Sequence, residues 1–182
     1  MCLGKEYLQT VIRRVKYYKE LGDKTFEQLN NDSDFHYQPN EESNSIAIII
    51  QHVSGNMLSR WTHFLTEDGE KEWRQRDDEF SIHQYSKEQL LGIWEKGWNC
   101  FLHTLEALHE DDLLKAVYIR QEKLSAVDAI NRQLAHYPYH VGQIVYIGRM
   151  IRDQAWKNLS IPKGHSQQYN KSENIKDPAK KF

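Results

Sequence analysis

The stretch that decides the fold is residues 125–151, SAVDAINRQLAHYPYHVGQIVYIGRMI. Its apolar residues recur at steps of three and four, which is the period of one face of an α-helix. Ser125 precedes them, and a serine hydroxyl readily accepts a hydrogen bond from a free backbone N–H at a helix start. The stretch therefore predicts a long amphipathic helix, and its buried stripe consists of Ile130, Leu134, Tyr137, Val141, Ile144 and Ile151.

Three earlier stretches have the same helical period. The first covers residues 4–30, and the second begins at Ser43 or Asn44 and ends near residue 65. The third follows Ser86, where Gln89 three residues later completes a capping box, and extends to residue 108. Residues 116–119 read as an extended segment. Four amphipathic helices in one small chain predict an all-α fold, a four-helix bundle with connections too long for the simplest up-and-down form.

Two regions fall outside this helical pattern. Residues 67–85 are polar and rich in turn residues, which is long for a structureless connection, so we expect a functional or interface loop there. After Trp156 the chain becomes polar. We therefore expect one helical domain over residues 1–157 and a C-terminal tail over residues 158–182 that packs on the surface or is partly disordered.

The composition excludes several classes of protein. With 24 basic and 26 acidic residues among 182, the net charge is −2, which argues against nucleic-acid binding by phosphate neutralisation. The longest aliphatic run, residues 46–50, is far shorter than the roughly 20 residues of a membrane span. Only two cysteines occur and no apolar leader segment is evident, so we expect a cytoplasmic protein.

A pair of histidines is the strongest candidate for chemistry. His136 and His140 are four residues apart, which places both rings on one face of the predicted helix, one turn apart. Both flank the apolar stripe and should point partly inward. His52, in the middle of the second predicted helix, is the best candidate for a third ligand from a facing helix.

Three imidazoles from two helices would form a metal site with open positions. Neutral imidazole suits Zn, Ni, Fe or Cu, and an open position admits water or a substrate. The alternative is that these histidines are ordinary core residues with satisfied hydrogen bonds. Pro138 lies between His136 and His140, where it either makes a tolerated kink or directs the two rings toward the bundle centre.

Other candidate sites are weaker. Glu106 and His109 form a single E-x-x-H pair, whereas a di-iron site in a bundle requires two such pairs. No phosphate-binding glycine loop or nucleophile-elbow motif is present. Cys100 lies in an apolar helical stretch and is best explained as a buried small hydrophobe. The remaining isolated histidines, expected at the surface, are His36, His63, His83, His103 and His165.

Two blocks of the sequence resemble the DinB superfamily, in particular a bacterial branch of unknown function. The first is IIQHVSGNMLSRW at residues 49–61, followed by FLTEDGEK at 64–71, WR at 73–74 and DDEF at 77–80. The second is AINRQLAHYPYHVGQI at residues 129–144. The resemblance covers nearly the whole chain and includes LSIPKG at residues 159–164.

The resemblance implies a DinB-type four-helix bundle with a divalent metal ion, Zn, Ni or Fe, held by His52, His136 and His140. It also implies a homodimer and a metal-dependent transferase of low-molecular-weight thiols, such as bacillithiol or mycothiol, or a related isomerase. Our first hypothesis is therefore a metal-dependent thiol S-transferase or a hydrolase. Asn56, Arg60 and Gln143 lie close enough in sequence to orient the ligands or bind a substrate. The alternative is a non-catalytic, stress-associated metal-binding or interaction protein of the same fold.

Overall fold

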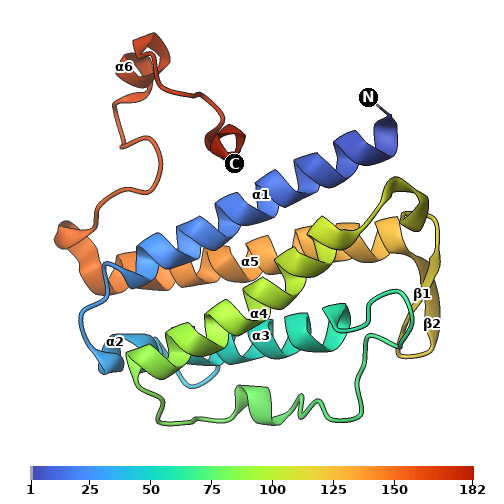
Figure 1. Ribbon diagram of the computed structural model, residues 1–182. Helices are drawn as coiled ribbons and strands as arrows, with labels where there is room; N and C mark the ends of the chain where they lie inside the picture. Colours follow the sequence, from blue (N-terminus) through green and yellow to red (C-terminus); the bar gives the residue numbers. More distant parts are fainter. Residues whose placement is uncertain (1) are drawn as a thin grey trace.

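The computed structural model describes residues 2–182, and these are mostly helical (Figure 1). Helices account for most of the described chain, as the sequence predicts. The longest are α1 (Leu3–Phe26), α3 (Ile46–Trp61), α4 (Lys87–Ala107) and α5 (Ala126–Arg152). The short elements are α2 (Asp32–His36), α6 (Ser166–Lys171), the 3₁₀ turns η1 (Asp78–Phe80), η2 (Glu110–Asp112), η3 (Asp153–Ala155) and η4 (Pro178–Lys181), and the strands β1 (Ala116–Ile119) and β2 (Glu122–Ser125).

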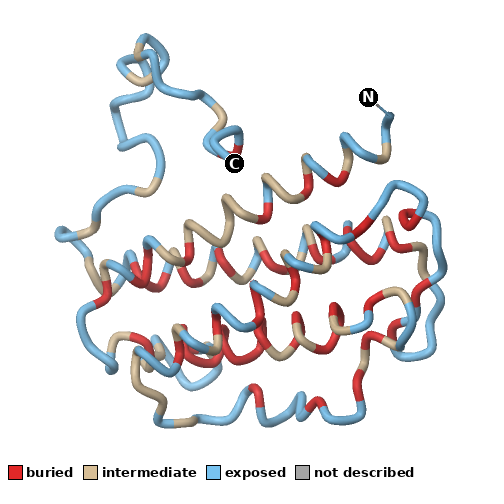
Figure 2. The backbone as a smooth tube through the Cα atoms, in the orientation of Figure 1, coloured by how far each residue is buried: buried red, intermediate tan, exposed pale blue. Residues whose placement is uncertain are grey.

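The core lies between the four long helices, where their buried faces meet (Figure 2). Helix α3 is the most enclosed, because all of its 16 residues except Gly55 and Leu58 are buried. The sequence predicted an amphipathic helix here, but the polar residues of α3 are buried as well, and these are Gln51, His52, Ser54, Asn56, Ser59 and Arg60. Large aromatic rings fill the centre, and the fully buried ones are Phe26, Phe35, Trp61, Trp94, Trp98, Phe101 and Tyr137.

The helix caps agree with the sequence at two starts and differ at a third. Ser125 Oγ accepts from Asp128 N at 3.3 Å, and Ser86 and Gln89 form the reciprocal capping box. Helix α3 is capped by Ser45, whose Oγ accepts from Ile48 N, so the prediction of Ser43 or Asn44 was wrong.

Two helices end about four residues earlier than predicted. Helix α1 ends at Phe26, because the next residues form tight turns that direct Leu29 into the core. Helix α3 ends at Trp61, where Thr62 is extended and His63 has a left-handed φ of 52°. The apolar residues beyond each end continue the helical spacing in the sequence, but in the structure they lie in turns and reach the core from there.

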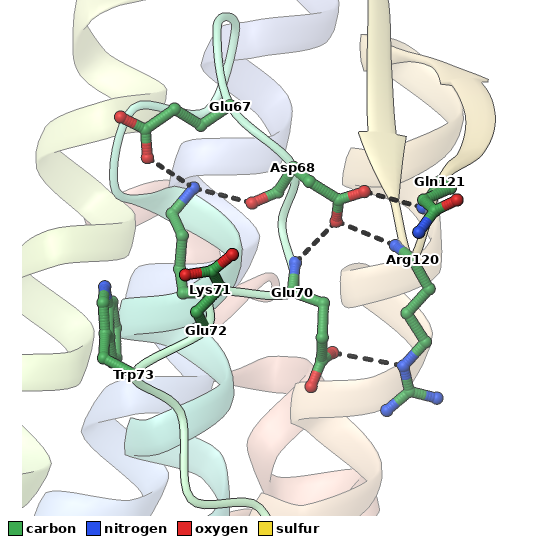
Figure 3. Close-up of a pocket in the computed structure, with 8 residues that line it drawn as sticks. All are labelled: Glu67, Asp68, Glu70, Lys71, Glu72, Trp73, Arg120 and Gln121. Atoms are coloured by element: carbon green, nitrogen blue, oxygen red, sulfur yellow. Dashed lines mark hydrogen bonds and ion pairs between the residues drawn. The ribbon is translucent and has the colours of Figure 1, made fainter.

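A β-hairpin precedes α5. Strand β1 occupies the predicted extended segment, and β2 pairs with it in antiparallel register. Arg120 and Gln121 form the two-residue turn with φ values of 56° and 66°, a conformation that usually calls for Gly or Asn. Asp68 stabilises it by accepting hydrogen bonds from both backbone N–H groups, at 2.8 and 2.6 Å (Figure 3). The hairpin is thereby anchored to the loop after α3.

After η3 the chain leaves the long helices, passes through α6 and returns to the side of α1 (Figure 1). Arg14 donates to both carboxylate oxygens of Asp177 at 2.6 Å, and Ala179 is buried. The end of the predicted tail is therefore packed on the surface of α1. Within residues 2–182, none of the helices has the length and apolar character that crossing a bilayer would demand.

Candidate metal centre

The structure brings His52, His136 and His140 together, although α3 and α5 are far apart in sequence. One ligand nitrogen from each ring lies within 4.8 Å of the other two. His52 is buried, and the two α5 histidines are half-buried. Within residues 2–182 this is the group of His, Cys, Asp or Glu side chains whose spacing suits a metal ion.

Each of the three rings is held by an acceptor on its outer nitrogen. His136 Nδ1 lies 3.2 Å from Gln133 Oε1, and His140 Nδ1 lies 2.8 Å from Gln143 Oε1. His52 Nδ1 lies 3.0 Å from Glu79 Oε2. Because amide and carboxylate oxygens only accept, each Nδ1 carries the hydrogen and donates it. Each Nε2 is therefore left with a free lone pair, which is the tautomer that a metal ligand requires.

The loop between α3 and α4 provides the partner of His52. Arg74 donates to both oxygens of Glu79, from Nε at 2.7 Å and from Nη2 at 2.9 Å, and both side chains are buried. Burial by itself would raise the pKa of Glu79, but the hydrogen bonds from His52 and Arg74 outweigh it and hold that pKa below its ordinary value. Glu79 is thus a buried anion that orients His52.

Gly55 explains how a loop carboxylate comes so close to a helix. A Cβ atom at this position would overlap the carboxylate of Glu79. Glycine in a helix interior is unfavourable by about 1 kcal/mol relative to alanine, so its presence here has a packing reason. The H-x-x-G spacing from His52 to Gly55 places the gap one turn beyond the histidine, on the same face of α3.

The free Nε2 atoms of the two α5 histidines lie at a distance that one metal ion can bridge. His136 Nε2 and His140 Nε2 face one another at 3.1 Å. With both hydrogens on the outer nitrogens, two lone pairs meet across this distance and repel unless a positive ion lies beside them. Imidazole nitrogens bound at about 2.1 Å to one ion, at right or tetrahedral angles, lie about 3.0–3.4 Å apart. The α5 pair therefore fits a divalent transition metal, and a nitrogen of His52 lies within 4.8 Å as the third ligand.

The surroundings keep these rings neutral. Burial, with the nearby charges of His140 and His52 next in order, lowers the pKa of His136 to about 3. Burial also lowers the pKa of His140. A neutral ring keeps its lone pair at neutral pH, so a metal ion would not have to displace a proton from either nitrogen.

Of the three polar residues predicted to orient the ligands or bind a substrate, only one is hydrogen-bonded to a histidine. Gln143 contacts His140 directly. Asn56 Oδ1 accepts from the hydroxyl of Tyr137 at 3.0 Å, and that hydroxyl accepts from Trp61 Nε1. Arg60 donates to the carbonyl of Gly69 and to Glu70, so it braces the loop rather than a ligand.

Sequence reasoning missed three residues that hold the rings: Gln133, Arg74 and Glu79. Gln133 lies three residues before His136, the mirror of Gln143 three residues after His140, so helical spacing was a usable signal. Arg74 and Glu79 lie in the 67–85 loop, which was expected to be functional, but no periodicity relates a loop residue to a helix face.

The other candidate groups do not assemble into a site. His63, His103 and His165 are exposed as expected, whereas His36 and His83 are half-buried. His36 Nε2 lies 2.8 Å from the carbonyl of Tyr85, which accounts for its burial. The exposed Glu106 is paired with Lys16 rather than with a metal-binding neighbour. Helix α5 continues through Pro138 from Ala126 to Arg152.

A family model described as "Protein of unknown function (DUF1572)" matches residues 2–165. The chain belongs to this family. The match spans α1 to the start of the tail, so it includes all three histidines and the loop that carries Glu79. No curated protein and no solved structure is similar enough to match.

Proposed function

We propose that this member of the DUF1572 family is a DinB-like four-helix protein that binds a divalent transition metal ion through His52, His136 and His140. The observation that carries the proposal is the arrangement of the three rings: each Nδ1 lies against an acceptor oxygen, at 3.0, 3.2 and 2.8 Å, which leaves the three Nε2 atoms free. Three histidines with only a packing role would have no reason to bond every Nδ1 to an acceptor and also to direct every Nε2 lone pair toward one point. Zn, Ni and Fe all suit such imidazole ligands.

The same site supports a metal-dependent enzyme over a purely structural metal centre. Three protein ligands leave coordination positions open, as in catalytic zinc sites, and a cavity of about 250 Å³ adjoins His52 and His136. A bound divalent ion would lower the pKa of a thiol or water molecule and so supply a nucleophile at neutral pH. We therefore propose transfer of a low-molecular-weight thiol, with hydrolysis as the second candidate.

The residues around the three histidines would hold the rings in place and position a substrate. Glu79, Gln133 and Gln143 hold the rings, and the ring of Phe80 covers that of His52 with centroids 4.8 Å apart. Asn56 lines the cavity and has an amide group one turn from His52 that could orient a substrate. A non-catalytic, stress-associated metal-binding protein is the alternative, and a metal held without turnover of any substrate would favour it.

Metal analysis tests the proposal directly. We expect the full-length protein, purified without chelator, to contain about one divalent ion per chain by mass spectrometry of the metals, and His136→Ala to lose it. His103→Ala is the matched control, because His103 is exposed and outside the cluster. A wild-type protein that takes up none of Zn, Ni or Fe would contradict the metal site. Assays with several low-molecular-weight thiols then separate the transferase from the non-catalytic alternative.

The homodimer and the cytoplasmic location stay predictions. Helix α5 offers a surface for a second copy, since Tyr139, Tyr146 and Met150 are exposed at helical spacing along it. Light scattering that gives the mass of a single chain at all concentrations would contradict the dimer.

A further inference from the structure

The cavity beside the histidines is lined mainly by basic side chains. It is lined by five arginines and by no carboxylate, and the arginines are Arg60, Arg74, Arg76, Arg120 and Arg132. They come from the end of α3, the loop after it, the hairpin and α5. The whole chain has a net charge of −2, so this gathering does not reflect a general excess of basic residues.

Two neighbouring glutamates compensate only part of this charge. Glu70 lies within 3.5 Å of Arg60, Arg74 and Arg120 (Figure 3 shows its pairing with Arg120). Glu79 is taken up by Arg74 and His52. Five guanidinium groups against Glu70, Glu79 and the exposed Asp77 beside Arg76 leave an excess of about two positive charges around a small space. Guanidinium groups stay protonated, so the excess cannot be relieved by losing protons.

Two buried donors of these arginines make no hydrogen bond within the 2–182 range, Arg60 Nε and Arg74 Nη1. Arg74 Nη1 has only a long ion-pair contact, with Glu70 Oε2 at 3.5 Å. Both side chains are more than nine-tenths buried. Buried donors normally have partners, and a charged donor without one is especially costly.

The two exposed arginines of the cavity have little compensation for their charge. Within the described chain, Arg132 makes no ion pair or side-chain hydrogen bond, and Arg76 lies over the ring of Phe80 and 3.9 Å from the exposed Asp77. The unused buried donors and the uncompensated positive charge together mean that an anion in this cavity would be stabilised.

We propose that this cavity binds the phosphate or carboxylate group of a small-molecule substrate, next to the reacting position at the three histidines. The proposal rests on the metal-centre function. Planar guanidinium groups match oxyanions, because two N–H groups of one arginine can bind two oxygens. A cavity of about 250 Å³ lies at the small end of ligand sites, so it suits one small anionic molecule rather than a polymer.

Binding of simple anions tests this inference. The probes are inorganic phosphate and malonate, titrated calorimetrically into the full-length protein, once as purified and once after chelator treatment. We expect saturable binding of at least one probe in both forms, and a loss of about tenfold in affinity for Arg132→Ala and for Arg76→Ala, because each removes a charged donor. Tighter phosphate binding indicates a phosphate ester as substrate, and tighter malonate binding indicates a carboxylate.

Arg149→Ala is the matched control. Arg149 is also an exposed arginine of α5 but lies outside the cavity, and we expect its replacement to change the affinity by less than about twofold. Equal losses for Arg132→Ala and Arg149→Ala, or no saturable binding of either probe, would overturn the anion site. Metal uptake without anion binding contradicts this inference alone. Anion binding by a protein that never takes up metal supports the anion site and contradicts the metal-centre function.

Discussion

Helices α3 and α5 contribute to the same cluster in different ways. On α5, His136 and His140 are each held by a glutamine three residues away on the same helix. On α3, the single histidine is held by Glu79, which lies 27 residues further along the chain in a loop. The α5 half of the site is therefore built by helix geometry, and the α3 half depends on how a long connection folds.

This difference has consequences for stability. The α5 pairs are neutral, and apart from the buried Gln133 their members are half-buried, so their loss should affect the rings more than the fold. The α3 pair belongs to a buried network in which Arg74 and Glu79 are an ion pair with almost no solvent exposure. Breaking one partner of a buried ion pair leaves the other charge unpaired, which is strongly destabilising.

Glu79→Gln should have the largest effect. It keeps the shape of the side chain but leaves the buried Arg74 with only the more distant Glu70 as a counter-ion, so we expect the free energy of unfolding to fall by about 3 kcal/mol. Chemical denaturation measures this change, and metal content should fall with it. Asp77→Asn is the control, because Asp77 is fully exposed. Equal unfolding free energies for the two variants would show that Glu79 does not stabilise the loop.

Gln133→Leu and Gln143→Leu test the α5 half. Each removes the acceptor that orients one ring, and loss of such an outer partner lowers metal affinity by about 10- to 100-fold. Competition with a chelator of known affinity measures it, and the helical circular dichroism should be unchanged. Affinities equal to that of the wild-type protein would mean that the glutamines do not position the histidines.

Gly55→Ala and Gly142→Ala form a pair with smaller effects of opposite sign. An added Cβ at Gly55 would overlap Glu79, whereas nothing lies within 4 Å of one at Gly142. We expect Gly55→Ala to destabilise the protein by about 1–3 kcal/mol, as overpacking does, and to weaken metal binding. Gly142→Ala should stabilise it by about 0.5–1 kcal/mol through helix propensity. Thermal denaturation of both variants measures these changes. If both substitutions stabilise the protein, Gly55 is not needed for packing against Glu79.

Much of the helical framework follows from local patterns. The starts of α4 and α5 were predicted at the correct serine because a capping hydroxyl and the first helical turn are neighbours in sequence. The ends of α1 and α3 were missed because turns there continue the apolar spacing. The hairpin turn was missed because Arg120 and Gln121 adopt a glycine-like conformation that is stabilised by Asp68, a residue about 50 positions away.

The amino-acid sequence alone determined that His136 and His140 could bind one metal ion and which stripe of α5 would be buried, because both follow from spacing within one helix. Only the tertiary structure decided that Glu79 and Arg74 orient His52 and that five arginines gather beside it. Those residues come from loops and from separate elements, where no regular repeat relates sequence position to direction. Their arrangement depends on packing and on the pairing of buried charges, which exist only once the chain has folded.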